Sequence, residues 1–560
     1  MKSASSSSGG LAVTLNGYVR LTEDVDILVD LSPDNVEKLI RSLSDIIPNY
    51  GIDRVRPLLL TPGLTNQVTE RAAFLTPPQS MENTSSRRNF IKGVAATAAA
   101  FNFQVVPSRV FGANDRITLA GIGTSGKGAS DISGSAGAGF QVTHLCDVFN
   151  TDKYPNLGGA YAKTRSDYPD AKFFEDWREM LDAEGDKIDA VTVSTPDHVH
   201  AHAAVAAMKK GCHVYCQKPL THGIWEARIL TEFAAKTGVV TQMGNQAHAQ
   251  DHMRRVVELI RAGLIGDVVE VHAWTNRPIW PQGIPAWPQK EEAPKHVNWD
   301  LWLGPAPFHD YSSQIAPFKW RGYWDFGTGA LGDMACHIMD MSFWAAELGA
   351  PTSVSAVSAD GRGAQSDLSP PTWATIEYQF PERNGKKPVK YMWYDGYKDA
   401  VFNADKWALE SSIDGGKIRE KNLPPAEVLD GQGIEEKDGY DSIVIGTRGK
   451  IWFNRSIDNW VVKPGNIMDG FAYPAQSIPR ARDEDPHKEF YDAIKAGDPS
   501  LPQSKFAHSG PFTEMVLLGN LAVRLNKKVE WDSATLSSPN TPEAAKFVKR
   551  EYRKGWELTV

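Results

Sequence analysis

The chain has few cysteines and no long apolar run. Its four cysteines, Cys146, Cys212, Cys216 and Cys336, are scattered and form no CxxC pair, so the sequence lacks both a disulfide framework and a cysteine metal site. We interpret all four as buried thiols. No apolar stretch reaches the roughly 18 residues that a bilayer-spanning helix needs, which excludes an ordinary membrane span.

The chain also lacks an excess of positive charge. Its formal net charge is −8 and its isoelectric point is about 6.0, and it contains no long basic run. A nucleic-acid-binding protein normally concentrates Lys and Arg on one surface, so we expect no nucleic-acid partner. With 41% hydrophobic and 23% charged residues over 560 positions, the composition is globular, and the length predicts two or more domains.

One segment has the pattern of a protein-targeting signal. The run SRRNFIK, residues 86–92, follows Met81 and precedes a weakly apolar, alanine-rich stretch over residues 94–106. Small residues before Asn114 suit a signal peptidase. Residues 81–113 therefore resemble a twin-arginine signal peptide, which makes the twin-arginine export machinery a partner and the periplasm, or another exported location, the destination. The alternative is a surface helix with two exposed arginines.

Residues 1–80 precede the expected start at Met81 and do not suit an export precursor. Within them, residues 17–30 faintly resemble the core strand of the nucleotidyltransferase fold, in which two aspartates two apart bind Mg²⁺. Asp24 and Asp26 would be that pair. The preceding Gly-Ser loop is missing, so we interpret the segment as an inactive fragment or an over-extended gene start. If it blocks the signal, the protein stays in the cytoplasm.

A glycine-rich turn follows the first clear strand. From Arg116 the chain reads RITLAGIGTSGKG, which contains GxGxxG at Gly121, Gly123 and Gly126. In this fingerprint the first glycine permits a tight turn, the second lets the backbone approach a pyrophosphate, and the third lets helix and strand pack closely. The next predicted strand ends at Asp147, where an acid accepts hydrogen bonds from the adenosine ribose and repels a 2′-phosphate. We therefore predict NAD rather than NADP as the cofactor.

Strand and helix patterns then alternate as far as Met243. This alternation predicts an α/β fold with a doubly wound parallel sheet, a Rossmann domain over residues 114–243. Over residues 244–560, strand-like runs such as TWATIEYQF predict an α+β domain with a large mixed or antiparallel sheet. Ligands of an open parallel sheet bind beyond the carboxyl ends of its strands. The segments STPDHVHA, residues 194–201, and CQKPL, residues 216–220, stand at such ends.

These two segments closely resemble those of the Gfo/Idh/MocA oxidoreductases, the glucose-fructose oxidoreductase and inositol dehydrogenase type. The resemblance runs from about Arg116 to the C-terminus. In that family the first segment lines the cofactor cleft, which implies contacts from Thr195, Pro196 and His198. The second usually reads EKP and carries a catalytic lysine at the cofactor, here Lys218. The glutamate position holds Gln217, which puts in doubt the charge partnership that a glutamate would make with the lysine.

A third segment, WDFGTGALGDMACHIMD over residues 324–340, matches the family's glycine-rich turn and a helix with aspartate and histidine four apart. Residues i and i+4 share a helix face, so Asp333 and His337 can both point at a substrate. With Lys218 they complete the catalytic set that the resemblance implies. We predict that His337 is the base, that Lys218 stabilises the alkoxide, and that Asp333 binds a neighbouring hydroxyl or orients the base. Taken alone, Asp333 and His337 could be a structural pair that caps a turn.

The resemblance implies hydride transfer between a sugar or polyol hydroxyl and NAD, in a homo-oligomer built through the C-terminal sheet. Because the twin-arginine route carries folded proteins, we expect the cofactor to be tightly bound. Two alternatives remain: a redox-neutral epimerase or glycoside-cleaving enzyme of the family, whose glycoside-cleaving branch lacks the KP pair, and a non-catalytic NAD-binding sensor. We predict no metal site, because nothing completes a coordination shell around His198 and His200.

The export signal gives a first testable prediction. Replacing Arg87 and Arg88 by lysine should keep the protein in the cytoplasm, and native mature protein should begin near Asn114. Cell fractionation and N-terminal sequencing measure both outcomes. The matched control replaces Arg109 by lysine, which makes the same chemical change within residues 81–113 but outside the motif. Export of the Arg87/Arg88 variant, or mature protein that retains residues 10–80, would contradict the prediction.

Overall fold

The computed structural model describes residues 116–150, 159–358, 367–413, 417–429, 441–455 and 457–560, together with three short strands near the N-terminus. Those strands are β1 (Ala12–Thr14), β2 (Tyr18–Val19) and β3 (Asp26–Leu28), and they form a small sheet in the order β2-β1-β3. The predicted export signal and Asp24 lie outside the described residues. The interpretations of residues 1–113 therefore stay predictions.

The first large sheet has six parallel strands in the order β6-β5-β4-β7-β8-β9. Along the chain they are β4 (Thr118–Ile122), β5 (Gln141–Cys146), β6 (Lys172–Phe174), β7 (Ala190–Val193), β8 (His213–Cys216) and β9 (Thr241–Met243). Its central strands are short apolar runs buried on both faces, as in other parallel sheets. The strand order reverses between β4 and β7, which confirms the predicted Rossmann fold and places a ligand crevice there.

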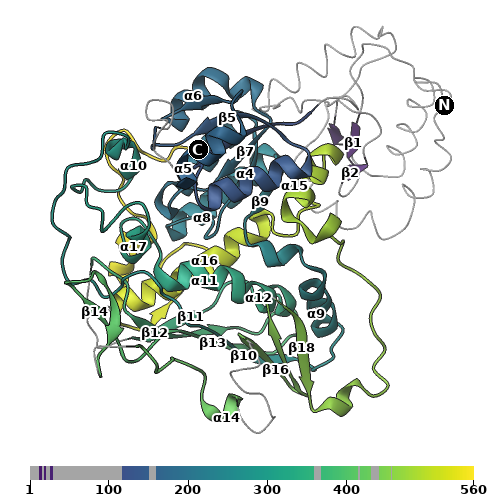
Figure 1. The fold of residues 1–560 in the computed structure, drawn as a ribbon. Coiled ribbons are helices and arrows are strands. Elements are labelled where there is room, and N and C mark those ends of the chain that lie inside the picture. The colour runs from purple at the N-terminus through teal and green to yellow at the C-terminus, as the bar shows by residue number, and fades with distance from the viewer. Residues whose placement is uncertain are drawn as a thin grey trace, which may run out of the picture. The chain divides into compact units, whose positions relative to one another are not determined.

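Five helices connect these strands: α4 (Lys127–Ala138), α5 (Gly159–Asp167), α6 (Trp177–Glu184), α7 (His200–Lys209) and α8 (Ile224–Thr237). Helices α6, α7 and α8 contact one another in series, and α4 contacts α5. The alanines of α7 are almost all buried, because their small side chains let the helix lie close to its neighbours. Figure 1 shows these helices around the sheet.

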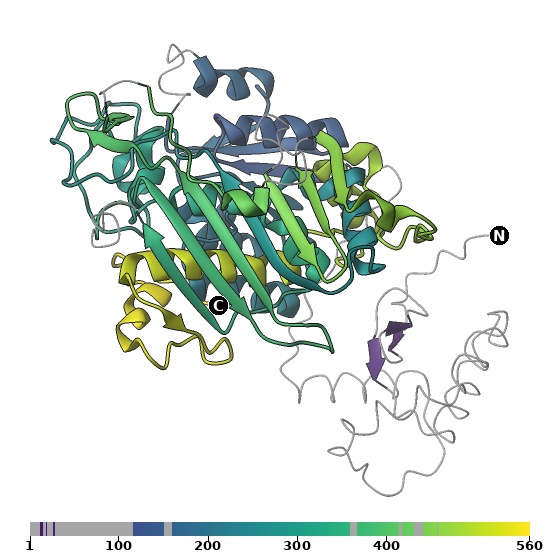
Figure 2. The same cartoon turned by 90° about the horizontal axis from the view of Figure 1, so that it is seen from below.

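The second large sheet has eight strands in the order β18-β17-β16-β10-β13-β12-β11-β19. Along the chain they are β10 (Val268–Thr275), β11 (Ser353–Ser358), β12 (Trp373–Phe380), β13 (Val389–Gly396), β16 (Ser442–Gly446), β17 (Lys450–Asn454), β18 (Ile457–Lys463) and β19 (Val529–Glu530). Only β10 and β13 pair in parallel. This confirms the predicted α+β region with a mixed sheet, which Figure 2 shows from below. A separate hairpin joins β14 (Ala400–Asn403) to β15 (Ala408–Ser411).

The remaining helices are α9 (Asp251–Arg261), α10 (Trp299–Leu303), α11 (Gly329–Ile338), α12 (Asp340–Ala346), α14 (Ala426–Leu429), α15 (Pro486–Ala496), α16 (Phe506–Leu525) and α17 (Ala545–Val548). Helix α16 contacts α8 of the Rossmann region as well as β11 and β12 of the second sheet. One hydrophobic core therefore runs through both regions. In the described part of the chain, no helix has the length and hydropathy of a membrane span.

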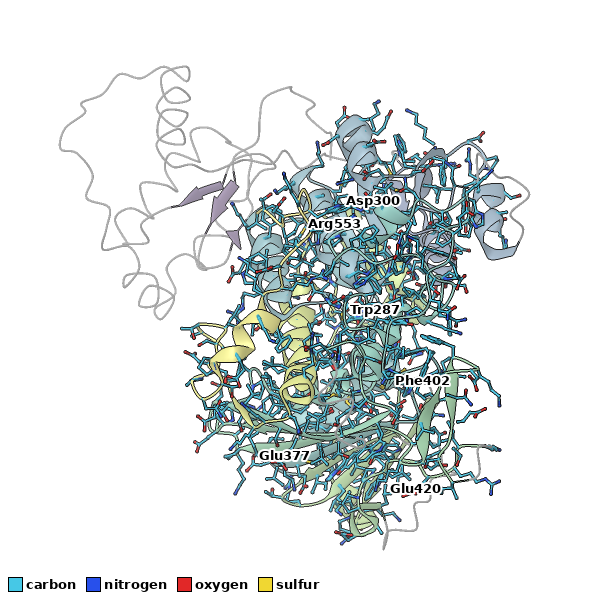
Figure 3. The ribbon with its side chains drawn as sticks, turned by 90° about the vertical axis from the view of Figure 1, so that its left-hand side faces the viewer. Trp287, Asp300, Glu377, Phe402, Glu420 and Arg553 are labelled. Carbon is cyan, nitrogen blue, oxygen red and sulfur yellow. The ribbon has the colours of Figure 1, made fainter. Side chains whose placement is uncertain are left out.

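Two C-terminal segments return to the Rossmann region. Helix α15, which we expected in the substrate domain, packs on α4 instead, because its apolar face, including Phe490, is buried against Phe140. The final residues also return to this region, because the Trp556 ring contacts Trp177 of α6. Nearby, Arg553 pairs with Asp300 of α10. Figure 3 shows the labelled side chains of Arg553 and Asp300 close together. The C-terminal 75 or so residues thus hold the two sheets together rather than form part of one domain.

Candidate functional site

The glycine turn after β4 leaves space for a close approach of backbone. Gly123 has φ +82°, and a Cβ there would lie 2.6 Å from the carbonyl oxygen of Ser194. A Cβ on Gly121 would lie 2.4 Å from Ile132. Gly123 therefore needs glycine, as the fingerprint predicts. Gly121 instead lies within β4, where the Ile132 side chain of α4 fills the space beside it, so the tight turn predicted for the first glycine is not formed there. The bare backbone at Gly123 and the N-terminus of α4 form the cradle in which Rossmann folds hold a pyrophosphate.

The third glycine of the fingerprint does not have the packing role that we predicted. Gly126 has φ +57°, and no atom lies within 4 Å of the position of its absent Cβ. Its function is the turn into α4. The close contact of helix and strand occurs at Gly128, where a Cβ would lie 2.1 Å from the carbonyl oxygen of Gly123. The spacing pattern identified the turn correctly but assigned its tightest contact two residues too early.

Asp147 follows β5 and binds the glycine turn. Its Oδ2 accepts hydrogen bonds from the backbone N and Oγ1 of Thr124, at 2.7 and 3.0 Å, and its Oδ1 accepts one from the backbone N of Phe149 at 3.1 Å. Burial raises the pKa of Asp147, and these hydrogen bonds oppose that change. Each carboxylate oxygen has two lone pairs, so the group can hold the turn and still accept a hydrogen bond from a ribose hydroxyl.

The segment after β7 contributes its backbone and small side chains to the crevice. Thr195 and Pro196 are half-buried there. His198, in contrast, is fully buried, and its Nδ1 and Nε2 lie 3.2 and 3.0 Å from the carbonyl oxygens of Phe326 and Trp302. Burial and the nearby Arg550 guanidinium lower the pKa of His198 to about 3, so the ring is neutral and donates to one carbonyl at a time.

The structure therefore does not bring the His198 side chain to the cofactor crevice. His200 is also buried, and its ring nitrogens lie 2.8 and 2.9 Å from the carbonyl oxygens of Pro219 and Thr195. These two histidines tie the segment after β7 to the segment after β8 and to the second region. Their spacing, which is also typical of metal ligands, here satisfies buried backbone carbonyls.

Lys218 and Asp333 meet across the crevice. Lys218 follows β8 and Asp333 lies on α11, yet Nζ is 2.6 Å from Oδ1 and 3.0 Å from the backbone oxygen of Asp333. Both side chains are 12% exposed. Arg321 is the second cation here, with Nε 3.4 Å from the same Oδ1. Burial opposes ionisation, but Lys218 and Arg321 outweigh it and hold the pKa of Asp333 well below its usual range.

His337 lies one helical turn after Asp333 on α11 and is partly exposed. Burial lowers its pKa well below the ordinary value, and the positive charges of Lys218 and Arg455 act in the same direction. Asp333 and Asp340 oppose the shift without reversing it. The imidazole is therefore neutral at pH 7, which is the form that accepts a proton. The three predicted catalytic residues thus comprise an ion pair and a neutral imidazole.

The comparisons with known proteins agree with this arrangement. Residues 122–245 match the Gfo/Idh/MocA model described as an oxidoreductase family, NAD-binding Rossmann fold. Residues 252–387 match the model described as an oxidoreductase family, C-terminal alpha/beta domain. Over these two stretches the chain is similar to both domains of the Gfo/Idh/MocA oxidoreductases. The matched residues include Lys218, Asp333 and His337, and the first match confirms the NAD-binding domain.

Relatives of the chain align over part of their length. A glycosyl hydrolase family 109 protein of Solibacter usitatus is 32% identical over 171 residues, which are 30% of this chain and 38% of that protein. Levoglucosan dehydrogenase of Pseudarthrobacter phenanthrenivorans is 25% identical over 169 residues, 30% of this chain and 35% of that protein. A solved levoglucosan dehydrogenase with NADH and levoglucosan has a TM-score of 0.47 and 16% identity, covering 74% of this chain and 99% of that chain. The sequence alignments thus span little more than a third of these curated relatives.

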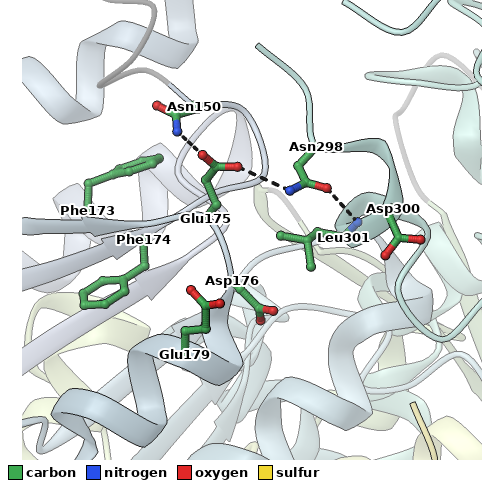
Figure 4. Close-up of a pocket in the computed structure, with 9 residues that line it drawn as sticks. All are labelled: Asn150, Phe173, Phe174, Glu175, Asp176, Glu179, Asn298, Asp300 and Leu301. Carbon is green, nitrogen blue, oxygen red and sulfur yellow. Dashed lines mark hydrogen bonds between the residues drawn. The ribbon is translucent and has the colours of Figure 1, made fainter. Parts of the chain in front are cut away.

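A cavity of about 690 Å³ lies at the carboxyl end of edge strand β6, beside α10. Figure 4 shows its lining residues: Asn150, Phe173, Phe174, Glu175, Asp176, Glu179, Asn298, Asp300 and Leu301. Glu175 accepts hydrogen bonds from Asn150 and Asn298. Four of the nine are carboxylates, which disfavour a phosphate. None of the three predicted catalytic residues lines this cavity, so it lies outside the catalytic centre.

A cluster of His248, Asp340 and His508 adjoins helix α11. Asp340 accepts hydrogen bonds from His248 Nδ1 at 2.5 Å and from His508 Nε2 at 2.8 Å. Burial alone would raise the pKa of Asp340, but the two histidines outweigh burial and lower it. Two ligands about 2.0 Å from a tetrahedral zinc lie about 3.3 Å apart, so these shorter distances indicate hydrogen bonds. The cluster joins α16 to the start of α12, and no spacing pattern in the sequence pointed to it.

Arg321 is the main site residue that the sequence analysis missed. Its guanidinium lies 4.2 Å from the Trp320 ring centroid, and its NH2 group is 3.6 Å from Asp197 Oδ1. Asp197 in turn accepts hydrogen bonds from the backbone N and Oγ1 of Thr328. The arginine thus connects the segment after β7 to the glycine turn before α11. It stands among tryptophans in a short 3-10 helix, Lys319–Gly322, where no periodicity or motif distinguishes it from a surface arginine.

The glycine geometry gives a prediction with a matched control on the same helix. Replacing Gly128 by alanine should abolish or severely weaken NAD binding, because the added Cβ would lie 2.1 Å from the Gly123 oxygen. Gly137 has open space around its Cβ position, so Gly137→Ala should instead stabilise α4 by up to ~1 kcal/mol. Titration of NAD by fluorescence and denaturant unfolding measure these effects. Equal NAD affinity in the two variants would contradict the packing assignment.

The low pKa of His337 predicts the position of the acid limb in the pH profile. Protonation removes the base, and because the pKa of His337 is lowered, kcat/KM should fall only below the ordinary histidine value of about 6.5. Arg455 contributes to the lowering, so Arg455→Gln should move the limb to higher pH. Steady-state rates at constant ionic strength give both profiles. If the acid limb of the parent protein's kcat/KM profile lay at or above about pH 6.5, the proposed pKa-lowering surroundings of His337 would be wrong.

Proposed function

We propose that this chain is an NAD-dependent dehydrogenase that oxidises a secondary hydroxyl of a sugar or polyol. The observation that carries the proposal is the meeting of Lys218 and Asp333, at 2.6 Å, on a crevice beyond the carboxyl ends of the parallel strands. His337 lies one turn along the same helix. A cation, a carboxylate and a neutral imidazole in one crevice are the groups needed to deprotonate an alcohol and to stabilise its alkoxide.

The residues around the glycine turn fit NAD. Gly123 and Gly128 leave the backbone bare where the pyrophosphate would lie, and the Asp147 carboxylate lies beside that turn. Thr195 and Pro196 line the next strand end. When NAD is bound, its nicotinamide ring supplies the carbon that accepts the hydride. A carboxylate at position 147 favours NAD over NADP, because it would repel a 2′-phosphate.

The protein's own groups move and stabilise the proton and the developing charge. Neutral His337 takes the hydroxyl proton as the substrate carbon becomes a carbonyl. Lys218 has three N–H donors, so it can keep its hydrogen bonds to Asp333 and still donate one to the substrate oxygen. Asp333 accepts from Lys218 and lies beside Arg321, which assigns it to positioning the lysine rather than the base. This differs from our expectation that it orients the base or the substrate.

The substrate class draws support from the names of relatives. Levoglucosan dehydrogenase and D-glucoside 3-dehydrogenase of Escherichia coli, which is 29% identical over 120 residues, both carry sugar substrates in their names. Seven tryptophans also fall between Trp274 and Trp324. Most of them are buried, whereas Trp287 is 38% exposed, and sugar C–H groups pack on exposed aromatic rings. We therefore propose a sugar or a glycoside rather than a small acid.

Tight retention of the cofactor, export and oligomerisation are further parts of the proposal. An exported enzyme meets no nicotinamide pool, so we propose that it keeps NAD. One sugar hydroxyl is then oxidised to a carbonyl as NAD becomes NADH, and a second carbonyl compound is reduced as NAD is regenerated. The twin-arginine-like segment supports export, and the family resemblance of the C-terminal sheet supports a homo-oligomer.

A second candidate function is redox-neutral cleavage of a glycosidic bond. It is favoured by the 32% identity to a glycosyl hydrolase family 109 protein. In such a reaction the substrate is oxidised and later reduced by the same NAD, so no net reduction of the cofactor is observed. Incubation with mono- and disaccharides, with absorbance at the NADH band and mass analysis of products, separates the two candidates. Oxidised sugar indicates a dehydrogenase, and free monosaccharides without oxidation indicate cleavage.

The catalytic assignment gives the central prediction. Lys218→Ala and His337→Ala should each lower turnover by ~10²-fold or more, while NAD stays bound, because both residues act on the substrate hydroxyl. Lys236→Ala, at an exposed position of α8, is the matched control and should leave turnover unchanged. Turnover is measured by product mass, and bound nucleotide by absorbance after gel filtration. Near-normal turnover in the Lys218 variant would remove the catalytic assignment, and parent protein without nucleotide would remove tight binding.

A further inference from the structure

A buried carboxylate lies beneath the cofactor crevice. Asp131, on α4, is 0% exposed. Its Oδ2 accepts hydrogen bonds from Ser194 Oγ at 2.8 Å and Gln217 Nε2 at 2.9 Å. Its Oδ1 lies 2.7 Å from Lys127 Nζ and 3.4 Å from His487 Nε2. The four partners come from four separate parts of the chain, so this one side chain ties α4 to the ends of β7 and β8 and to α15.

Asp131 is ionised in this environment. Burial alone would raise its pKa, but His487 and Lys127 outweigh burial and lower it. The other titratable groups nearby are Asp485, 3.2 Å from the His487 ring, and the buried side chains of Tyr215 and Cys216. Burial and the Asp131 charge raise the pKa values of the last two, so both stay neutral. Lys127 therefore provides the nearest positive charge to a carboxylate that is otherwise held by hydrogen bonds.

Gln217 is held in place by the same carboxylate. Its side chain is buried, and its backbone N donates to the carbonyl oxygen of Val193 at 2.8 Å. A Cβ on Gly244 would lie 2.3 Å from Gln217 Nε2, so the glycine leaves the space that the amide fills. A carboxylate can only accept hydrogen bonds, which means that the amide must present its NH₂ group. The residue directly after it is Lys218, whose Nζ reaches Asp333.

We propose that Asp131 and Gln217 are a positioning pair for the catalytic Lys218. In this pair Asp131 supplies, from helix α4, the buried negative charge that the motif EKP would place at position 217. The pairing explains why this chain has glutamine there. A glutamate would bring two carboxylates about 3 Å apart, and two such groups cannot both ionise in a buried site. The kcat measurements that test this pair rest on the proposed dehydrogenase function. The NAD-binding measurements do not.

The pairing predicts a pH-dependent defect that a purely structural role would not produce. In Gln217→Glu the two carboxylates share one proton at low pH, which preserves the hydrogen bond between them. As the pH rises that proton is lost, and repulsion between the charges displaces the strand end and Lys218 with it. We expect kcat to fall about tenfold or more between pH 6 and pH 8.5 relative to the parent protein, with a smaller change in KM.

The decisive variant exchanges the two groups. In the double variant Asp131→Asn with Gln217→Glu, an amide on α4 faces a carboxylate at position 217, so the hydrogen bond is kept with its polarity reversed. We expect kcat within about threefold of the parent and no fall at alkaline pH, whereas each single variant is impaired. Gln141→Glu, on an exposed position of β5, is the matched control and should match the parent.

Several outcomes would overturn the pairing. They are a Gln217→Glu protein with the pH profile of the parent, or a double variant no better than the poorer single variant. If Gln217→Glu is insoluble, restoration of soluble yield and thermal midpoint by Asp131→Asn supports the pair, and no restoration refutes it.

NAD titration of the parent, the two single variants and the double variant distinguishes failure of the positioning pair from failure of the proposed function. A parent that binds NAD but oxidises no sugar removes that function alone. About tenfold coupling between the two positions in the NAD dissociation constant would still support the pair, and additive effects would overturn it.

Discussion

The contact between Lys218 and Asp333 is the constraint on which the rest of the site depends. Each partner belongs to a different sheet region, and both are almost wholly removed from water. Removing a lysine and an aspartate from water costs several kcal/mol each, so such a pair persists only with good geometry and further hydrogen bonds. The backbone oxygen of Asp333 and the guanidinium of Arg321 provide them. The relative position of the two regions is therefore set at the crevice itself.

The hydrophobic core and the C-terminal segments make that position rigid. Helix α16 lies between the two sheets, and its apolar residues belong to a core that includes strands of both. Helix α15 lies on α4, and the Arg550 guanidinium donates hydrogen bonds to Glu226 and to the carbonyl oxygen of His198. A crevice held from both sides opens less readily than one between two freely hinged domains. That property agrees with a cofactor that stays bound.

The sequence allowed the two fold types, the glycine turn and the meeting of Lys218, Asp333 and His337 to be predicted, because each depends on local periodicity or on a motif. It did not allow the direction of side chains to be predicted. His198 stands at the expected strand end, yet its ring turns away to satisfy buried carbonyls. Asp131 and Arg321 were missed for a related reason. A helix aspartate and a loop arginine have ordinary surroundings in sequence, and only tertiary packing buries them.

The charges in the crevice explain why neighbouring titratable groups can take different roles. Lys218 and Arg321 keep Asp333 ionised, and burial together with Lys218 keeps His337 neutral. One cation thus holds a carboxylate charged and, one helical turn away, an imidazole free of its proton. If Asp333 were neutral, Lys218 would lose its partner, and the positive charge beside His337 would no longer be balanced. The ion pair therefore determines where the lysine points, while burial together with the lysine charge keeps the neighbouring imidazole neutral.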